Sequence, residues 1–483
     1  MNITEQDIEK IIRSVVKEAL NDEKPQATMD TKVSTGGQGD GGIFDDMNDA
    51  IEAAHKTYMT MRTDYTMADR QRFIDGIKAF TLKEKNKLAQ MVLEETNLGN
   101  YHDKVLKHEL AARSAGTEDL TTAAKSGDTG LVINEMAPFG VIGATTPVTN
   151  PSETVIANTI NMVAAGNTVV FNVHPGSKNV CAYVINKINE IIVSLGGPKN
   201  VVTMVRTPSM ESLQTMAKNP KINLLVGTGG PGLVRALLQS GKKAIGAGAG
   251  NPPVVVDETA IIKNAARDII TGHSFDNNIV CILEKEVFVV DSVANELIQE
   301  MQLNGAFLAS KQQAEQLVDL VLQVDKVDEQ GKKVYKLNKK WVGQDPYKYL
   351  DACNIPYSQK PKCIITETDF SHPFVQKELL MPILPIVRVD NVDEAIDLGV
   401  KAEHGNRHTA IMHSQNIMNL TKFAKVINTT IFVKNAPSIA GLGVGSEGVP
   451  GFTIAGPTGE GITTSKTFTR NRYCVLVDGF RII

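Results

Sequence analysis

The spacing of apolar residues changes along the chain, and each change predicts a different kind of structure. In residues 1–20 the apolar side chains recur every three or four positions, while charged and polar side chains fill the opposite face. This spacing predicts an amphipathic helix. Its apolar face consists of Ile8, Ile11, Ile12, Val15, Val16, Ala19 and Leu20. Residues 21–42 are polar and rich in glycine, which is the composition of a flexible linker.

Two roles fit such a helix: it can dock on its own domain, or it can bind in the groove of another protein. The long linker that follows favours the second role. The helix does not resemble a secretory signal, because its apolar residues are periodic and not continuous, nor a transit peptide, because it contains several acidic residues. We therefore expect a detachable segment that targets the chain to a partner.

The main body of the chain begins with helical spacing over residues 43–124 and then changes period near residue 140. Short apolar runs there alternate with helical segments. The runs are GVIGATT, NTVVFNV, VVTMV, INLLVG and KKAIGA. Strands that alternate with helices predict a parallel sheet covered on both faces. Such a sheet binds ligands at the carboxyl ends of its strands.

A second alternating set begins after Asn251 and is interrupted by a charged region at about 311–360. Its strand-like runs are PVVVD, EVFVV, ILPIVRV, HTAIMHS and TTIFVKN. This set predicts a second α/β domain, and it contains Cys281. Residues 131–138 and 464–480 are also strand-like but fit neither sheet, so we expect them to form a protruding ribbon that pairs between subunits.

Composition narrows the class of protein. A chain of 483 residues is too long for one core, so two or three domains are expected. A net charge of −4 with both signs interspersed argues against nucleic acid or an anionic membrane as a partner. No apolar run approaches the length of a membrane span. The five cysteines form no CxxC pair and no metal-binding spacing, which predicts reduced thiols in a cytosol and no metal site.

Cys281 ends the run HSFDNNIVC and precedes ILEKEVFVVD, which has the pattern of a strand. An ionised thiol is a good nucleophile and can hold an acyl group as a thioester. The alternative is a small buried hydrophobic residue, which is the role we expect for Cys181 and Cys474. Nothing acidic lies between Lys243 and Asp257, so this turn offers no carboxylate that could direct water at a thioester.

Three other positions could contact a ligand. GTGGPG (227–232) ends a strand and opens a helix, as a pyrophosphate-binding turn does, but such turns are also common without a nucleotide. Asn150, in ATTPVTNPSETV, could donate its amide to an oxyanion, or it could simply form an Asn-Pro turn. His174 follows a strand of the same sheet and could touch a ligand or serve as a turn residue.

Together these segments resemble the aldehyde dehydrogenase superfamily across residues 43–483. The resemblance rests on the Pro-x-x-Asn-Pro turn at Asn150, on GTGGPG, on the spacing from GAGAGN to Cys281, and on KELLMPILPI (377–386). Three segments, GAGAGNPPVVVD, HSFDNNIVC and EHGNRHTAIMHS, are similar to the coenzyme A-acylating branch, which includes propionaldehyde and acetaldehyde dehydrogenases of bacterial microcompartments.

The resemblance implies an α/β fold with a Rossmann-type nucleotide-binding domain over 43–247 and a catalytic domain over 248–440. Residues 119–137 and 441–483 would supply a return segment and a small β oligomerisation ribbon, which implies a homodimer or homotetramer. The first helix looks like an encapsulation peptide that binds a shell protein. It would place the enzyme inside a microcompartment in the cytoplasm.

The resemblance also implies the site. Cys281 would be the nucleophile, and Asn150 with the backbone N–H of Cys281 would form the oxyanion hole. The cofactor NAD would contact Thr146, Pro147, His174, Gly227, Thr228, Gly232 and Glu378. Hydrolytic relatives carry a glutamate at the position of Ala247, and a lysine and a glutamate at those of Asn172 and Pro175.

The implied reaction converts a short-chain aldehyde, propionaldehyde first and acetaldehyde second, with NAD and coenzyme A, to an acyl-CoA and NADH. Because Ala247 cannot activate water, transfer of the acyl group to a thiol is favoured. Two alternatives remain open: a hydrolytic dehydrogenase that yields the free acid, and a non-catalytic scaffold that binds the shell.

Overall fold

The computed structural model describes residues 39–327, 331 and 333–483. The helix expected over 1–20, and the linker expected over 21–42 up to residue 38, lie outside these residues. Within the described ranges, no helix combines the length and the apolar character needed to cross a membrane.

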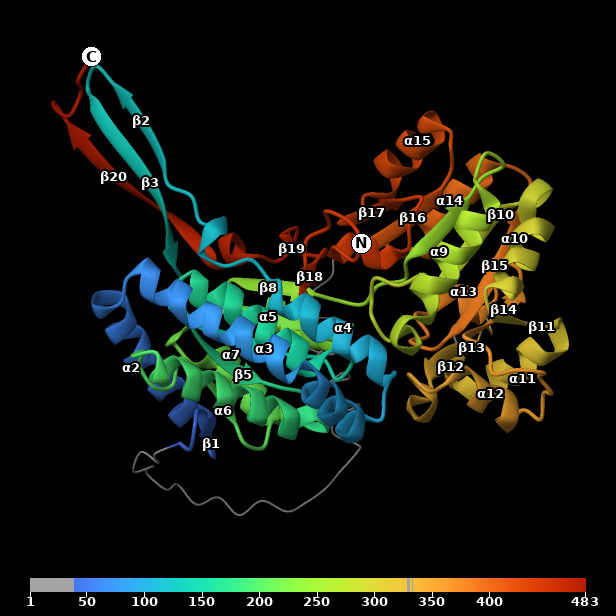
Figure 1. The fold of residues 1–483 in the computed structure, drawn as a ribbon, viewed down its shortest axis with the longest axis horizontal. Coiled ribbons are helices and arrows are strands. Elements are labelled where there is room, and N and C mark those ends of the chain that lie inside the picture. The colour runs from blue at the N-terminus through green and yellow to red at the C-terminus, as the bar shows by residue number, and fades with distance from the viewer. Residues whose placement is uncertain (1–38, 328–330, 332) are drawn as a thin grey trace. The chain divides into compact units, whose positions relative to one another are not determined.

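A first sheet of six parallel strands forms one half of the described chain (Figure 1). Its strands are β1 (Ile43–Phe44), β4 (Val141–Thr145), β5 (Thr168–Asn172), β6 (Val202–Val205), β7 (Ile222–Thr228) and β8 (Ala244–Ala247). The apolar runs predict β4 to β8. They do not predict β1, which is only two residues long and lies where helical spacing was expected to begin.

Seven helices belong to this half. They are α2 (Met47–Asp64), α3 (Met67–Thr96), α4 (Tyr101–Ala112), α5 (Pro151–Ala164), α6 (Lys178–Ser194), α7 (Met210–Lys218) and α8 (Pro231–Leu238). Helix α5 is buried along its whole length, because it packs against strand β5 as well as against α3, α4 and α6. This explains why its sequence, NPSETVIANTINMVAAG, has few charges and no polar face.

The strand order β1-β6-β5-β4-β7-β8 shows where along this sheet a ligand is expected to bind. The chain moves outward from β4 through β5 to β6, and then returns to the other side of β4 with β7 and β8. A parallel sheet binds ligands where the winding direction reverses, which here is between β4 and β7. Asn150 follows β4 and the GTGGPG turn begins in β7, so both lie at this point.

A second parallel sheet has the order β11-β14-β15-β10-β9-β16-β17. Its strands are β9 (Pro253–Val256), β10 (Glu286–Val290), β11 (Ala306–Ala309), β14 (Cys363–Glu367), β15 (Ile383–Val389), β16 (Thr409–His413) and β17 (Ile431–Lys434). Its helices are α9 (Ile262–Ser274), α10 (Asp291–Leu303), α11 (Lys311–Val321), α12 (Pro346–Ala352), α13 (Pro373–Gln376), α14 (Val392–Ala402) and α15 (Ile417–Ile427). The charged region holds α11, α12 and an antiparallel hairpin of β12 (Leu322–Val327) and β13 (Lys333–Leu337).

The strand expected directly after Cys281 starts later than its pattern suggests. Residues 281–283 form a turn and a bend, residues 284 and 285 have irregular backbone, and β10 begins at Glu286. The Lys285 ammonium donates to the carbonyls of Asn278 and Val280, at 2.9 and 3.3 Å, and so folds this segment back on itself.

Three antiparallel strands, β2 (Ala123–Gly127), β3 (Gly130–Pro138) and β20 (Thr469–Val477), form a separate ribbon (Figure 1). Residues 131–138 and the end of the chain therefore pair within one chain, although β20 begins only at Thr469 because Ser465–Phe468 forms a 3-10 helix. The expected pairing between subunits stays a prediction. The expectation that Cys474 is buried is wrong, because Cys474 lies on β20 and is exposed. A ribbon without a packed layer cannot bury its apolar side chains within one chain, and Tyr473, Val475 and Val477 are exposed too.

Candidate active site

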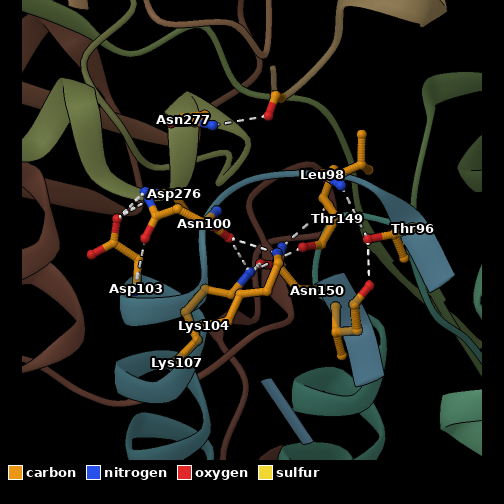
Figure 2. Close-up of polar contacts among 12 residues, drawn as sticks. Thr96, Leu98, Asn100, Asp103, Lys104, Lys107, Thr149, Asn150, Asp276 and Asn277 are labelled. Carbon is orange, nitrogen blue, oxygen red and sulfur yellow. Dashed lines mark hydrogen bonds and ion pairs between the residues drawn. The ribbon is translucent and has the colours of Figure 1, made fainter. Parts of the chain in front are cut away.

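Asn150 lies between β4 and α5, where it is the N-cap residue of the helix. Its side chain is buried but makes no capping bond to the helix. Instead the Lys107 ammonium donates to Asn150 Oδ1 at 2.9 Å, and Asn150 Nδ2 donates to Thr149 Oγ1 at 3.2 Å (Figure 2). The amide of Asn150 is therefore held from both ends and is not free to serve as an ordinary turn residue.

The loop that leads to Cys281 has an unusual backbone. Asp276, Asn277 and Asn278 have φ angles of 45°, 52° and 65°, which is the left-handed region. This conformation costs an ordinary L-residue about 1–2 kcal/mol, and Asn and Asp tolerate it best. Three such residues in succession persist only where surrounding contacts hold them, and such strain is concentrated at functional sites.

Buried polar contacts hold each of these residues. The Asp276 carboxylate accepts from the Asn100 backbone N–H at 2.8 Å and from two lysines of α4, and its own N–H donates to Asp103 (Figure 2). Asn277 Nδ2 donates to the Gly343 carbonyl at 3.0 Å and to Asp345 at 3.1 Å. Asn278 donates to the carbonyls of His273 and Glu284 and accepts from Lys285. The DNN sequence is thus explained by its conformation and by its partners.

Cys281 is half-buried at the end of this loop. Burial, with the nearby Glu378 carboxyl adding to it, raises the pKa of the Cys281 thiol to about 12, while Lys285 opposes this shift. Burial also raises the pKa of Glu378 to about 7. The thiol is therefore neutral at rest, and it lies beside a carboxyl group that can change its protonation state near neutral pH.

Gly250 brings Cys281, Glu378 and one further residue together. Its N–H donates to Glu378 Oε1 at 3.3 Å. A Cβ on Gly250 would lie 2.7 Å from the Cys281 carbonyl oxygen and 2.9 Å from Cγ of His408, so only glycine fits. His408 is fully buried, and burial together with Lys285 lowers its pKa to about 4. A neutral imidazole thus lies near the Cys281 backbone, a position that the sequence pattern did not single out.

The glycines of the GTGGPG turn leave space where side chains would otherwise lie. A Cβ on Gly227 would meet Leu237, whereas a Cβ on Gly230 or Gly232 would meet nothing within 4 Å. Gly230 is the N-cap of α8 and no side chain caps the helix. An open helix start with an exposed backbone is suited to a pyrophosphate, so the residues present fit a dinucleotide here. Thr228 is less available, because its hydroxyl bonds to Thr453 at 2.9 Å.

The other predicted cofactor residues lie at the same edge of the sheet. Thr146, which is buried, and Pro147, which is half-buried, follow β4. His174 follows β5 and is exposed, and its Nδ1 accepts the Gly176 N–H at 3.1 Å, as a turn residue does. Asn172 is bonded to Ser212 Oγ at 2.6 Å. The cofactor contacts of these residues stay predictions.

Ala247 ends strand β8 and is buried beside the turn, where its carbonyl accepts the Gly229 N–H at 3.2 Å. The Ala247 methyl group brings no titratable atom to this position. Among the described residues, no group of three or more His, Cys, Asp or Glu side chains could hold a metal ion.

Comparison with known proteins places this geometry in a family. Residues 40–444 match the aldehyde dehydrogenase family. A propanal dehydrogenase (CoA-propanoylating) from Salmonella typhimurium is 44% identical over 484 residues, and the acetaldehyde dehydrogenase (acetylating) EutE from the same organism is 43% identical over 483. Both alignments cover 100% of this chain and 100% of the relative.

Solved structures give the same answer. A propionaldehyde dehydrogenase from Rhodopseudomonas palustris with bound CoA and an acylated cysteine is 49% identical, with a TM-score of 0.86 over 90% of this chain and 98% of that one. A propionaldehyde dehydrogenase from the fucose utilisation microcompartment of Clostridium phytofermentans is 49% identical, with a TM-score of 0.87 over 92% and 100%. The resemblance and the fold class inferred from the sequence are confirmed, and the chain belongs to the aldehyde dehydrogenase family.

Proposed function

We propose that this enzyme oxidises a short-chain aldehyde and transfers the acyl group to coenzyme A through a thioester on Cys281. The observation that carries the proposal is the half-buried Cys281 thiol at the end of a strained loop, and this loop is tied to the element that orients Asn150. A nicotinamide dinucleotide, when bound, accepts a hydride from the substrate carbon. The glycine turn at 227–232 and Glu378 hold it, and Thr146, Pro147 and His174 contribute to the same edge.

The first half of the proposed reaction forms the thioester, and Cys281 and Asn150 each act in one of its steps. Cys281 loses its proton as its sulfur adds to the aldehyde carbon. Charge develops on the aldehyde oxygen, and Asn150 Nδ2 with the Cys281 backbone N–H donates to it. When the carbonyl re-forms, Cys281 holds the acyl group as a thioester.

The second half of the reaction uses the same groups. The thiol of coenzyme A loses its proton and attacks the thioester carbon, and the same oxygen again accepts from Asn150 and the Cys281 N–H. When the carbonyl re-forms, the bond to the Cys281 sulfur breaks, and the Cys281 thiolate leaves and takes up a proton. Water competes poorly, because a thiol is the stronger nucleophile near neutral pH and Ala247 supplies no base. The proposed product is therefore an acyl-CoA and not a free acid.

Relatives of nearly equal identity act on propanal and on acetaldehyde, so we propose propionaldehyde as the first substrate and acetaldehyde as the second. The test is a product-resolved assay over aldehydes of increasing chain length, with and without coenzyme A. We expect acyl-CoA and NADH in equal amounts. Free acid formed at the same rate without coenzyme A would contradict the proposal. In Ala247→Glu, the share of free acid should rise.

We further propose that residues 1–20 direct the enzyme to a microcompartment by binding a shell protein. The amphipathic pattern and the microcompartment origin of a close structural relative support this. Deletion of residues 1–20 should leave kcat and KM unchanged and abolish co-purification with shell proteins. Grafting them onto an unrelated protein should carry that protein into the compartment. Loss of activity on deletion would contradict the proposal.

We propose that the ribbon of β2, β3 and β20 joins subunits into a homodimer or homotetramer, and that domain boundaries lie near residues 247 and 440. The exposed apolar residues of β20 support the first point, because such a patch is usually covered. In Val475→Lys, sedimentation should report smaller particles than in the native enzyme. Unchanged particles would argue against this interface.

A further inference from the structure

Helix α4 carries two lysines that are withdrawn from water. The side chains of Lys104 and Lys107 are 0% and 1% exposed, and they lie three residues apart on one face of the helix. A buried ammonium group is tolerated only with close counter-charges and hydrogen bonds. The counter-charges are Asp276, which both lysines contact, and Glu153, which contacts Lys107 at 3.3 Å.

The two lysines differ in their further partners. Lys104 Nζ bonds to Asp276 Oδ2 at 3.1 Å. Lys107 Nζ also bonds to Asp276 Oδ2, at 2.6 Å, and in addition donates to the Thr149 carbonyl at 3.0 Å and to Asn150 Oδ1 at 2.9 Å (Figure 2). Lys107 alone of this pair reaches the residue that is proposed to donate to the oxyanion.

This contact decides which way the Asn150 amide points. An ammonium group can only donate, so the atom that faces Lys107 must be the amide oxygen, and the reversed amide would bring two donors together. Nδ2 is thereby directed away from Lys107. The ammonium also withdraws electron density from the amide, and in a buried site a polarised amide is a stronger donor.

The same Nζ atom connects the donor to the nucleophile's loop. Asp276 begins the left-handed stretch that ends near Cys281, and Asn150 begins α5. One cation bonded to both therefore sets where the oxyanion donor lies relative to that loop. Burial would lower the pKa of Lys107, but Asp276 and Glu153 outweigh it and raise this pKa, which keeps the group charged.

We propose that Lys107 is a positioning residue that fixes and polarises the Asn150 amide for oxyanion stabilisation. The inference rests on the proposed function of Asn150 and Cys281. Lys107 does not touch the substrate in this scheme, and its effect on rate passes through Asn150.

The first experiment compares Lys107→Met with Lys104→Met in the full-length enzyme. Both changes remove one buried charge from Asp276, but only the first frees the Asn150 amide, and it also removes the ion pair to Glu153 and the bond to the Thr149 carbonyl. Removing an oxyanion donor outright costs about 10²–10³ in kcat, so we expect Lys107→Met to lower kcat by about 10- to 100-fold. Lys104→Met should lose much less, and the KM for the nucleotide should change little in both. Equal losses in both variants would overturn the proposal.

The second experiment tests whether Lys107 acts through Asn150. In an Asn150→Ala background the amide is already gone. If Lys107 acts only through this amide, adding Lys107→Met should lower kcat further by less than about threefold, which is near the error of a double-mutant cycle. A full additional 10- to 100-fold loss would show that Lys107 acts elsewhere.

A third measurement separates oxyanion positioning from a general collapse of the loop. Alkylation of Cys281 by iodoacetamide develops no oxyanion, so its rate, followed by mass spectrometry of the Cys281 peptide, should be near native in Lys107→Met. A large change would indicate a displaced loop and overturn the proposal. If Lys107→Met fails to fold, the double variant Lys107→Met/Glu153→Gln is compared with Glu153→Gln. The Glu153→Gln change removes the carboxylate that Lys107→Met alone would leave unpaired. Native enzyme that forms no acyl-CoA would refute the proposed function instead.

Discussion

The loop before Cys281 and the glycine turn after β7 both bring backbone to the proposed site, but they are built in opposite ways. Asp276, Asn277 and Asn278 hold a strained backbone through many buried side-chain bonds. Gly230 and Gly232 have no side chains, and the space beside them is open. The loop before Cys281, the proposed nucleophile, is fixed by the side-chain bonds around it. The turn, in contrast, offers space to a ligand because no side chain fills it.

The difference follows from what each part must bind. A nucleophile and an oxyanion donor must be held at one geometry before the reaction, which requires side chains that are themselves fixed. A pyrophosphate supplies its own charge and shape and needs only backbone N–H groups and space. Substitutions in the two regions should therefore fail in different ways.

The largest effect is expected at the nucleophile. Cys281→Ala should abolish aldehyde-dependent NADH formation, because no other group can form the thioester. Nucleotide binding, measured by calorimetry, should remain, because the glycine turn lies on the other sheet. Substantial residual turnover would remove Cys281 from the mechanism.

Asp276→Asn tests the side-chain support of the loop. Asparagine tolerates the same φ of 45°, but the change leaves Lys104 and Lys107 without their shared carboxylate. Removing one partner of a buried ion pair costs about 3–5 kcal/mol, which denaturant unfolding should detect along with loss of activity. The control is Asp393→Asn, whose exposed pair with Lys422 should be worth less than about 1 kcal/mol. Equal effects would mean that burial is unimportant here.

Glu284 helps to hold the loop before Cys281, because its backbone carbonyl accepts from the side-chain amide of Asn278. Burial raises the pKa of its side chain to about 7 from 4.5. A raised carboxyl pKa adds stability below pH 4.5, and this stability is lost as the pH rises through 7. Between pH 4.5 and 7 the Glu284 carboxyl makes the free energy of unfolding fall by up to about 1.4 kcal/mol per pH unit, and Glu284→Gln should abolish this fall. Thermal unfolding of both proteins between pH 4.5 and 8 checks this, and parallel curves would contradict it.

The smallest effect is expected in the glycine turn. Gly232→Ala adds a methyl group that meets no protein atom, so it should stabilise the free enzyme by about 0.4–1 kcal/mol. The same methyl occupies space proposed for the pyrophosphate, so the KM for the nucleotide should rise roughly tenfold, about 1.4 kcal/mol. Gly127→Ala, on the ribbon with similar open space, is the matched control. An unchanged KM for the nucleotide would show that the pyrophosphate does not bind beside Gly232.

Most strands of the two sheets were predictable because their signals are local. The buried runs that became β4 to β8 are continuous and apolar, and Gly-rich or Asn-Pro segments mark the turns between them. Strand β1 was missed because two residues carry no period. Strands β11 and β14 were missed as well, because they are short and lie on either side of the charged region. Cys474 was misjudged because an apolar strand is buried only if something packs on it, and the sequence does not say whether that surface lies in the same chain.

The charged part of the site could not be predicted in the same way. In YHDKVLKHELAA, Lys104 and Lys107 have the spacing of an ordinary solvated helix face, and only tertiary packing buries them. His408 adjoins Cys281 through Gly250, a contact between residues far apart in sequence. One signal was available: three successive Asp and Asn residues, the types that best tolerate a positive φ, precede Cys281.

The bonds of Lys107 also bear on how the enzyme is assembled during synthesis. Helix α4 and Asn150 leave the ribosome well before Asp276, and until Asp276 docks, the two lysines of α4 lack their main counter-ion and favour water over burial. Docking of the later segment buries both lysines and sets the distance between thiol and amide in one event. In a half-folded chain whose Asp276 segment has not docked, the Cys281 thiol and the proposed oxyanion donor are therefore not yet held together.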